Sequence, residues 1–348
     1  MTLARHLGIA VLAALVIVLA SIKLGSYRDY QLAGVAAYLA AVAGLTVLIG
    51  LSGQISLGHG AFMAIGAYAA ALLLLHLHWP LEIVFAASVV ITAAGGAIVG
   101  VAGARLRGPY LAGATLMLAV ALPSVADKYP GVFGGDQGLN ISITTPAFLG
   151  ATFPPTRWLL WLTSAATLIA LVLLANLARS RVGRSWRAVR DDEVAAALAG
   201  LNVARLKILA FVVSAAAAGL GGALLAVVTT SVSPGAFTLA LSIGLLTAAV
   251  IGGLGSLAGA LWGSLVFVFV PTYLTDVASS HGLSSAASSS IPIAAYGVVL
   301  IVVMLVFPAG VQGGVRRLLG PVTPAQGPPF SKLRRHRSAT EHQEEGTR

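Results

Sequence analysis

The chain has 348 residues, of which 58% are hydrophobic and 9% are charged, whereas a typical soluble domain has about 25% charged residues. This composition excludes an ordinary soluble fold and predicts an all-α polytopic membrane protein. The sequence has no cysteine, which excludes disulfides, a thiolate nucleophile and a cysteine-ligated metal site. We expect no metal and no cofactor.

Ten apolar segments of roughly 17–25 residues follow one another along the chain, each suited to crossing a bilayer. They are about 7–24, 31–50, 55–76, 81–104, 110–126, 156–177, 207–230, 237–252, 256–274 and 291–308. Two are less clear, 110–126 because it is short and 237–252 because of its Gly and Ser content. The first segment could also be a cleaved signal peptide, but we expect it to be retained, because polytopic proteins usually insert without processing.

The positive charges are distributed unevenly between the loops. If the polar insert at 178–206 is cytoplasmic, alternation of the spans puts both termini in the cytoplasm. Of the 21 Lys and Arg residues, four then lie outside, Lys23, Arg28, Lys128 and Arg157, and the other 21 − 4 = 17 lie inside. Because positive charge favours the cytoplasmic side, the net charge of +10 is explained by topology, and we expect no nucleic-acid partner.

A first motif, GLSGQISLGHGAFMAIGAYAAALL, occupies 50–73. Its small residues allow a tight turn and close helix packing. We expect its start to line a polar path, because small residues let helices approach and part and its short side chains supply polar groups within the membrane. The candidates here are Gln54, Ser56, His59 and Gly60.

The same motif allows a remote enzymatic alternative. Gly50-Leu51-Ser52-Gly53 matches the G-x-S-G of intramembrane serine proteases, and Ser52 would be the nucleophile. That chemistry requires a histidine at membrane depth to activate the serine. The chain also has no G-x-x-x-x-G-K-[ST] loop, so we expect no nucleotide site and no catalytic residue.

The polar insert predicts a short helix outside the membrane. Asp191 or Asp192 is a suitable N-cap, and Glu193 in the first turn would complement the helix dipole. We expect this helix, roughly 15 Å long, to cover 191–201 and to contact a partner protein. Gly200 or Asn202 can end it in a left-handed conformation. A solvated connecting loop is the alternative.

The two sides of this predicted helix differ. An apolar stripe at helical spacing is formed by Val194, Ala197, Leu198 and Leu201. The other side, on which we expect a partner's groove to close, carries Glu193, Ala196 and Gly200.

A weak internal repeat relates the two halves. Residues 56–62 (SLGHGAF) align with 231–237 (SVSPGAF) at an offset of 235 − 60 = 175. An inverted repeat of five spans plus five would place these stretches on opposite sides of the membrane, flanking a central cavity. The second stretch adds the path candidates Ser231, Ser233 and Gly235. Two tight turns are the alternative.

The remaining features concern energy supply and the tail. The acids of the membrane region lie at span ends or in loops, which disfavours a proton- or sodium-coupled carrier and favours a mechanical input. Gly255, Gly259 and Gly263 lie at four-residue spacing, which is typical of close helix packing. We expect 1–308 to be the membrane domain and 309–348, with KLRRHR at 332–337, to be a disordered basic cytoplasmic tail near anionic membrane lipid.

Several strings resemble a known family. E-x-A-A-A-x-x-G, from Glu193 to Gly200, resembles the EAA-type coupling loop of ATP-binding-cassette (ABC) importer permeases. The longer string RDDEVAAALAGLNVARLKILAFVVSAAAAGLGGALLA and the motif at 50–73 are similar to those of branched-chain amino acid permeases, the LivM type in particular. FGGDQGLNI resembles the family's periplasmic T-G-G-x-x-G segment, with Phe133 where Thr is usual. The resemblance covers about residues 30–310.

The resemblance implies a type II-like ABC importer permease of the bacterial inner membrane that takes up branched-chain or related amino acids. The implied partners are a LivH-type permease, two cytoplasmic ATPase subunits that hydrolyse ATP, and a periplasmic solute-binding protein. The implied ATPase-coupling residues are Arg190, Asp191, Asp192, Glu193, Ala196, Gly200 and Leu201. Related permeases carry urea, amides or sugars, and such a substrate is the alternative.

Overall fold

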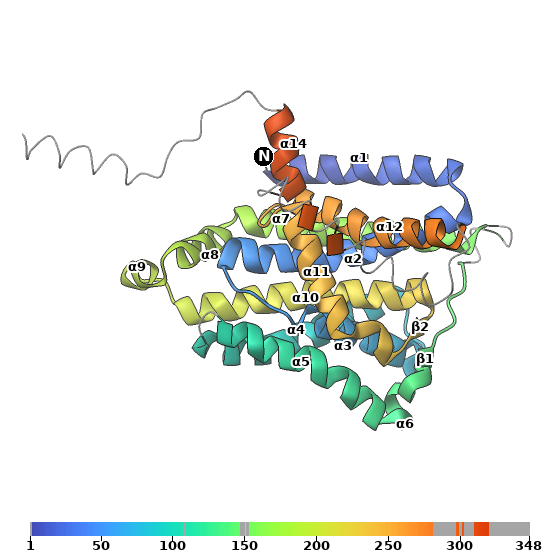
Figure 1. Ribbon diagram of the computed structural model, residues 1–348, viewed down its shortest axis with the longest axis horizontal. Coiled ribbons are helices and arrows are strands. Elements are labelled where there is room, and N and C mark those ends of the chain that lie inside the picture. Colours follow the sequence, from blue (N-terminus) through green and yellow to red (C-terminus); the bar gives the residue numbers. More distant parts are fainter. Residues whose placement is uncertain are drawn as a thin grey trace, which may run out of the picture. The chain divides into compact units, whose positions relative to one another are not determined.

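The computed structural model describes residues 2–106, 109–146, 150, 153–280, 297–298, 301–302 and 310–319. The chain forms two units, Met1–Gln312 and Gly313–Arg348, and the account below concerns the first. The described part is mainly helical (Figure 1). Its α-helices are α1 Thr2–Lys23, α2 Ser26–Ser52, α3 His59–Leu72, α4 Leu81–Arg105, α5 Pro109–Lys128, α6 Pro130–Phe133, α7 Pro155–Arg179, α8 Arg181–Asp191, α9 Glu193–Leu198, α10 Val203–Thr229, α11 Leu239–Gly252, α12 Leu257–Ser280 and α14 Gly310–Leu319.

Shorter elements complete the described fold. A π-helical turn, η1 Leu73–Leu77, extends α3, and 3₁₀ turns are found at η2 Gly135–Gln137 and η4 Pro234–Phe237. The two strands, β1 Leu139–Asn140 and β2 Ser231–Val232, pair antiparallel, with Leu139 opposite Val232.

The prediction of a polytopic all-α protein is confirmed. Within the described ranges, eight helical stretches are long and apolar enough to cross a membrane, and they match the first seven predicted spans and the ninth. The eighth, 237–252, is the 14-residue α11, which at about 21 Å is shorter than the roughly 30 Å hydrocarbon core. The tenth, 291–308, lies outside the described residues apart from 297–298 and 301–302.

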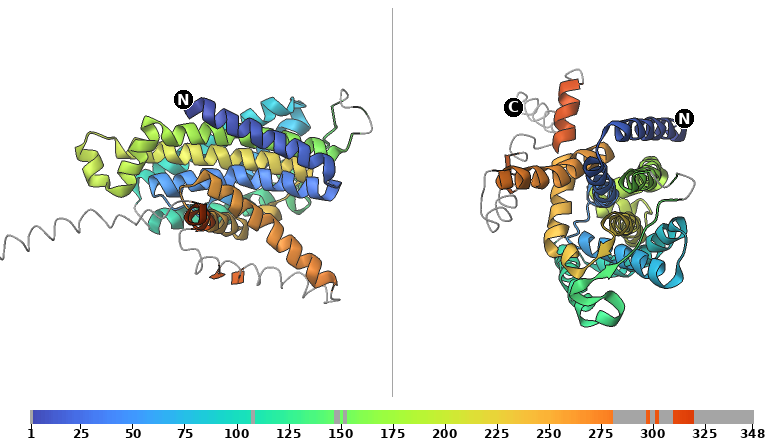
Figure 2. Two further views of the ribbon diagram at one scale, coloured as in Figure 1. Left: turned by 90° about the horizontal axis from the view of Figure 1, so that it is seen from above. Right: turned by 90° about the vertical axis from the view of Figure 1, so that its right-hand side faces the viewer.

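Helix α10 is the centre of the bundle, packed against α2, α3 and α4 (Figure 2). Glycines on three sides of α10 allow this close approach. Gly219 faces α4, Gly221 faces α2 and Gly222 faces α3, and a Cβ at any of the three would overlap atoms of the facing helix. Small residues of this kind let helix backbones approach closely within a membrane. The string AGLGGALL therefore specifies the hub of the fold.

Helix α1 is peripheral. It packs on α7, where His6 Nδ1 lies 2.9 Å from Asn176 Oδ1 and Trp161 Nε1 donates to Ser21 Oγ over 3.0 Å. Most of its large apolar side chains are exposed, as a lipid-facing helix requires.

The bundle has two distinguishable ends. We call the end where α8 and α9 lie the insert end; there α2 and α7 finish and α10 begins. A Cβ on Gly50 would overlap the backbone of Gly255, so the turn between α11 and α12 also lies at the insert end. The opposite end, with β1 and β2, is called the distal end. In both figures α11 runs at a steep angle to α10.

The segment predicted as a disordered tail contains α14, Gly310–Leu319, in its described part. The bond from Trp262 Nε1 to Gln312 Oε1, 3.2 Å, attaches the start of α14 to α12. The boundary of the membrane domain at residue 308 stays a prediction, and 320–348 lie outside the described residues.

The packing around α10 gives a first testable prediction. Gly222→Ala should lower the free energy of unfolding by about 1–3 kcal/mol, the usual cost of overpacking, because the new methyl group would meet the Met63 carbonyl oxygen. Gly34→Ala is the matched control, since nothing lies within 4 Å of a Cβ at that position. Thermal unfolding of both purified variants in detergent measures the difference; equal stability would contradict the packing argument.

Candidate functional site

The polar insert forms two short helices, α8 and α9, so the prediction of one helix over 191–201 was wrong in its bounds. Asp192 separates them, with an extended backbone at φ −158° and ψ 109°. Its carboxylate accepts hydrogen bonds from Val194 N at 2.8 Å and Ala195 N at 3.0 Å. Asp192 is thus the N-cap of α9, one of the two predicted possibilities.

The end of α9 is a Schellman motif. Leu201 N donates to Ala196 O over 3.1 Å, and Gly200 N donates to Ala197 O over 3.0 Å. Gly200 has φ +84°, a conformation that side chains with a Cβ rarely adopt, and this confirms the predicted left-handed termination. Asn202 has a different role, since its Oδ1 caps α10 by accepting from Arg205 N.

One residue of the side expected to face a partner is buried instead. Ala196 is 4% exposed, whereas Val194 and Leu198 of the apolar stripe are 69% and 85% exposed. An ion pair gives the physical reason: Glu193 Oε1 lies 2.5 Å from Lys207 Nζ, which holds that side of α9 against α10. The outward surface of the insert is therefore apolar at Val194 and Leu198.

Helix α8 is anchored on both α2 and α10. The indole of Trp186 is fully buried, and its Nε1 donates to Leu206 O over 2.9 Å. Arg190 Nη1 donates to Gly50 O, the last turn of α2, over 2.5 Å. Arg190 also packs on Gly53, where a Cβ would lie 2.8 Å from its Cγ. The insert is thus attached to the end of α2 and the start of α10.

Residues 53–58 are non-helical, so the predicted third span begins at His59 rather than at 55. Non-helical backbone at membrane depth is tolerated only where it is buried in protein or lines a cavity. Here Gly53 and Ile55 are exposed, whereas Gln54, Ser56 and Gly58 are buried. Side chains accept two of the N–H groups: Leu57 N donates to Thr115 Oγ1 over 3.0 Å, and Gly58 N donates to Ser56 Oγ over 3.3 Å.

The amide of Gln54 links this segment to the insert end of α10. Its Nε2 donates to Lys207 O over 3.2 Å and to Ser52 Oγ over 2.9 Å. Lys207 is the residue whose ammonium pairs with Glu193 of α9. The ion pair of the insert and the bond from the non-helical segment therefore meet at the same residue of α10.

His59 fixes the other end of the segment deep in the bundle. Its Nε2 lies 2.6 Å from Ser214 Oγ and its Nδ1 lies 3.1 Å from Ser56 Oγ, and the side chain is fully buried. Ser214 is about 17 Å along α10 from Val203, at 1.5 Å per residue. Residues 53–58 thus run from the insert end of α10 to a point near its middle.

The second predicted stretch approaches the same point from the distal end. Ser231 lies in β2, and Gly235 is exposed in η4, with Ser233 between them. The chain then enters α11, whose Ser242 Oγ accepts from Gly60 N at 3.0 Å. The structure therefore brings together the beginnings of α3 and α11, and the role of both stretches in a path stays a prediction.

The serine that a protease would require is engaged in its own helix. Ser52 Oγ donates to Leu48 O over 2.7 Å, and the side chain is buried. The hydrogen bonds of His59 go to Ser56 and Ser214, so the pair that would activate Ser52 is not formed here.

Several residues of this arrangement were not among the predicted ones: Lys207, Thr115, Ser214 and Ser242. A lysine at the start of an apolar run requires a partner, so Lys207 could have been identified from the sequence. Lone hydroxyl groups in predicted spans indicate hydrogen bonds between helices but do not say to which helix.

Comparison of the sequence with known proteins shows similarity to one family of transport proteins. The profile described as "Branched-chain amino acid transport system / permease component" matches residues 27–308. The chain is 34% identical over 236 residues to the high-affinity branched-chain amino acid transport system permease protein LivM of Salmonella typhimurium, covering 61% of this chain and 55% of that protein. It is 31% identical over 295 residues to BraD of Pseudomonas aeruginosa, a permease protein of such a system, covering 78% and 89%.

A further relative is the permease protein LivH of Escherichia coli, 32% identical over 194 residues and 56% of each chain. The match spans about half the length of LivM and of LivH. No solved structure matches the chain.

The buried segment gives a second prediction. Thr115→Val should leave Leu57 N–H without its acceptor and lower the free energy of unfolding by about 1–3 kcal/mol. Thr163→Val is the matched control, because this equally buried hydroxyl donates to Leu159 and Leu160 in its own helix. Denaturation of both variants in detergent gives the comparison, and an equal or larger loss in Thr163→Val would refute the role of Thr115.

Proposed function

Because this chain belongs to the family of permease components of branched-chain amino acid transport systems, we propose that it is the transmembrane subunit of an ABC importer for branched-chain amino acids. Its partners are a LivH-type permease, two ATPase subunits that hydrolyse the ATP, and a periplasmic solute-binding protein. The chain itself contributes the membrane path and no catalytic residue.

One observation carries this proposal: the insert presents an apolar pair to the outside while it is firmly attached to the bundle. Val194 and Leu198 are exposed next to solvent-facing charges, as a docking surface for another protein would be. The same insert is held by the pair Glu193–Lys207 and by the bond from Arg190 to Gly50 O. Force applied to α9 is therefore transmitted to α2 and α10.

The line of contacts continues to the beginnings of α3 and α11. Gln54 bonds to the α10 backbone beside the insert, and His59 and Gly60 bond to Ser214 and Ser242. A displacement of α8 and α9 thus reaches the place where two helices begin inside the bundle. Broken helices that meet within the membrane are the elements that transporters use around a substrate path.

This function implies an orientation. The insert end faces the cytoplasm, where the ATPase subunits are, and the distal end faces the periplasm of a bacterial inner membrane. The distribution of Lys and Arg supports this orientation through the positive-inside rule. Both termini then lie in the cytoplasm.

A third prediction tests the docking surface. Leu198→Glu should abolish association with the ATPase subunits and ATP-driven uptake, because it places a charge in the apolar contact while the bonds of Glu193 and Arg190 remain. Ala188→Glu, an equally charged change at an exposed position of α8, is the control and should retain both. Co-purification of the subunits and uptake of labelled leucine are measured together; normal association of Leu198→Glu would exclude this surface.

The fourth prediction tests the path with single cysteines, since the chain has none of its own. Gly235→Cys, exposed in η4, should react with a water-soluble thiol reagent in the resting importer. Ser56→Cys and Gly60→Cys, both buried, should react only in a nucleotide-bound state that opens the junction of α3 and α11. Labelling is followed by mass spectrometry, and protection of Ser56→Cys and Gly60→Cys in every nucleotide state shows that they do not line the path.

A further inference from the structure

Three arginines surround the corner between α7 and α8 at the insert end. Arg179 is the last residue of α7, and Arg181 and Arg184 belong to the first turn of α8. All three are exposed, and among the described residues no carboxylate pairs with any of them. Arg184 Nη1 donates to Arg179 O over 3.3 Å, which keeps this guanidinium at the end of α7.

The acids of the insert do not compensate this charge, because each is engaged elsewhere. Asp191 pairs with Arg190 at 2.8 Å. Glu193 pairs with Lys207, and Asp192 caps α9. Positive charges that lie close together repel one another, so an anion bound at this corner would be stabilising.

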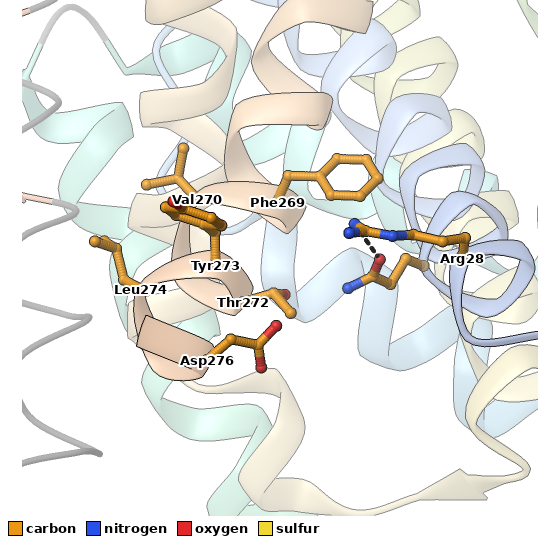
Figure 3. A pocket seen from close by; sticks show the side chains of 8 residues that line it. Arg28, Phe269, Val270, Thr272, Tyr273, Leu274 and Asp276 are labelled. Atoms are coloured by element: carbon orange, nitrogen blue, oxygen red, sulfur yellow. Dashed lines mark hydrogen bonds between the residues drawn. The ribbon is translucent and has the colours of Figure 1, made fainter. Parts of the chain in front are cut away.

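The two arginines of the distal end are engaged within the bundle instead. Arg157 Nε lies 3.7 Å from the buried carboxylate of Asp29. Arg28 Nη1 donates to Gln31 Oε1 over 3.1 Å. The guanidinium of Arg28 also lies 5.9 Å from the centre of the Phe269 ring, beside the cavity between α2 and α12 (Figure 3). Arginines without a partner are therefore a feature of the insert end.

Helix α1 brings a further exposed arginine, Arg5, to the same level of the bundle. His6 lies opposite Asn176, with 2.9 Å between Nδ1 and Oδ1. Towards the insert end, Arg5 lies about 1.5 Å beyond His6 and Arg179 about 4.5 Å beyond Asn176, so their depths differ by only about 3 Å. Arg179 follows Asn176 by three residues and therefore lies on the side of α7 that α1 contacts.

The length of α1 places Arg5 at a membrane boundary. Its 22 residues extend about 33 Å, close to the hydrocarbon thickness of about 30 Å, and Arg5 lies in the first turn. Arg5, Ile9 and Leu12 follow at i, i+4 and i+7, and all three are exposed. One face of α1 thus has a cation at headgroup depth and apolar side chains below it. A ligand that fits this face has an anionic head and an apolar chain.

We propose that Arg5 and Arg179 bind the phosphate of an anionic phospholipid, with an acyl chain along Ile9 and Leu12, and that this lipid holds α1 on α7. The planar fork of a guanidinium matches a phosphate, and two arginines on different helices can bind the same phosphate. Basic sites between spanning helices are known to bind anionic headgroups. The site is separate from the apolar surface of α9 and does not depend on the transported substrate.

The test measures hydrogen exchange of residues 5–12 in the purified full chain, in an uncharged detergent. Phosphatidylglycerol added to the micelles should slow this exchange at least about threefold, because it fixes the start of α1. Phosphatidylcholine should not do so, because its choline compensates the phosphate. Inorganic phosphate should not do so either, because it lacks the acyl chain. Native mass spectrometry of the same samples counts the lipid molecules that stay bound.

Two pairs of variants separate the site from general surface charge. Arg5→Gln and Arg179→Gln should each raise the phosphatidylglycerol concentration needed for protection about fivefold, the contribution of one cation near an anionic headgroup. Lys23→Gln, at the opposite end of α1, and Arg105→Gln are the controls and should not change it. Arg105 resembles Arg179, since each is the exposed last residue of a 25-residue helix.

Four outcomes would overturn the proposal. The first is equal protection by phosphatidylcholine, and the second is protection by inorganic phosphate alone, which would indicate a site for free anions. The third is an unchanged lipid requirement in both Arg5→Gln and Arg179→Gln. The fourth is displacement of the bound lipid by the ATPase subunits, because the arginines would then belong to the docking surface of the insert. Phosphatidylglycerol that stays bound without slowing exchange in α1 would refute its role in holding this helix.

Discussion

The break between α2 and α3 sets the main physical requirement of this structure. Residues 53–58 leave the helical conformation, and the part that leads into α3, with Ser56 and Gly58, is buried in the bundle, where water is not available to satisfy backbone groups. Side chains from other helices take that place: Thr115 of α5 accepts from Leu57 N, and Ser242 of α11 accepts from Gly60 N in the first turn of α3. The positions of α5, α10 and α11 are therefore tied to this segment and the first turn of α3. A change in that segment requires coordinated changes in all three helices.

The insert lies next to this segment, since Arg190 packs on Gly53 and Gln54 bonds to Lys207, the partner of Glu193. Its two helices are not loosely attached, because a buried tryptophan, an ion pair and an arginine bond fix them to α2 and α10. Rigid attachment suits a mechanical role, since a flexible insert would absorb a displacement rather than transmit it. The glycine-lined faces of α10 complete the arrangement, because helices that touch through backbone can slide without interlocked side chains.

The positions of long helices and single local conformations can be predicted from this sequence, whereas contacts between distant residues cannot. Long apolar runs such as α10 are predictable because bilayer thickness fixes their length, and Gly200 is predictable because its conformation is a local property. The start of α3 was predicted at residue 55 rather than at His59, because the apolar and small residues at 55–58 would also suit a helix. The bond between His59 and Ser214 joins residues 155 apart, and no local pattern records such a pairing. The burial of Ala196 was not predicted, because the ion pair of Glu193 with Lys207 that holds this side of α9 against α10 is not recorded in any local pattern.

The peripheral position of α1 has a consequence for the architecture of related chains. The family profile begins at residue 27, just after α1 ends, and α1 touches the remainder mainly through α7. A chain that started at α2 would keep the hub intact but would have its amino terminus at the distal end. Gain or loss of this single helix therefore reverses the side on which the amino terminus emerges, without altering the orientation of the transport core. A fused reporter at that terminus would report the presence of α1 rather than the topology of the permease.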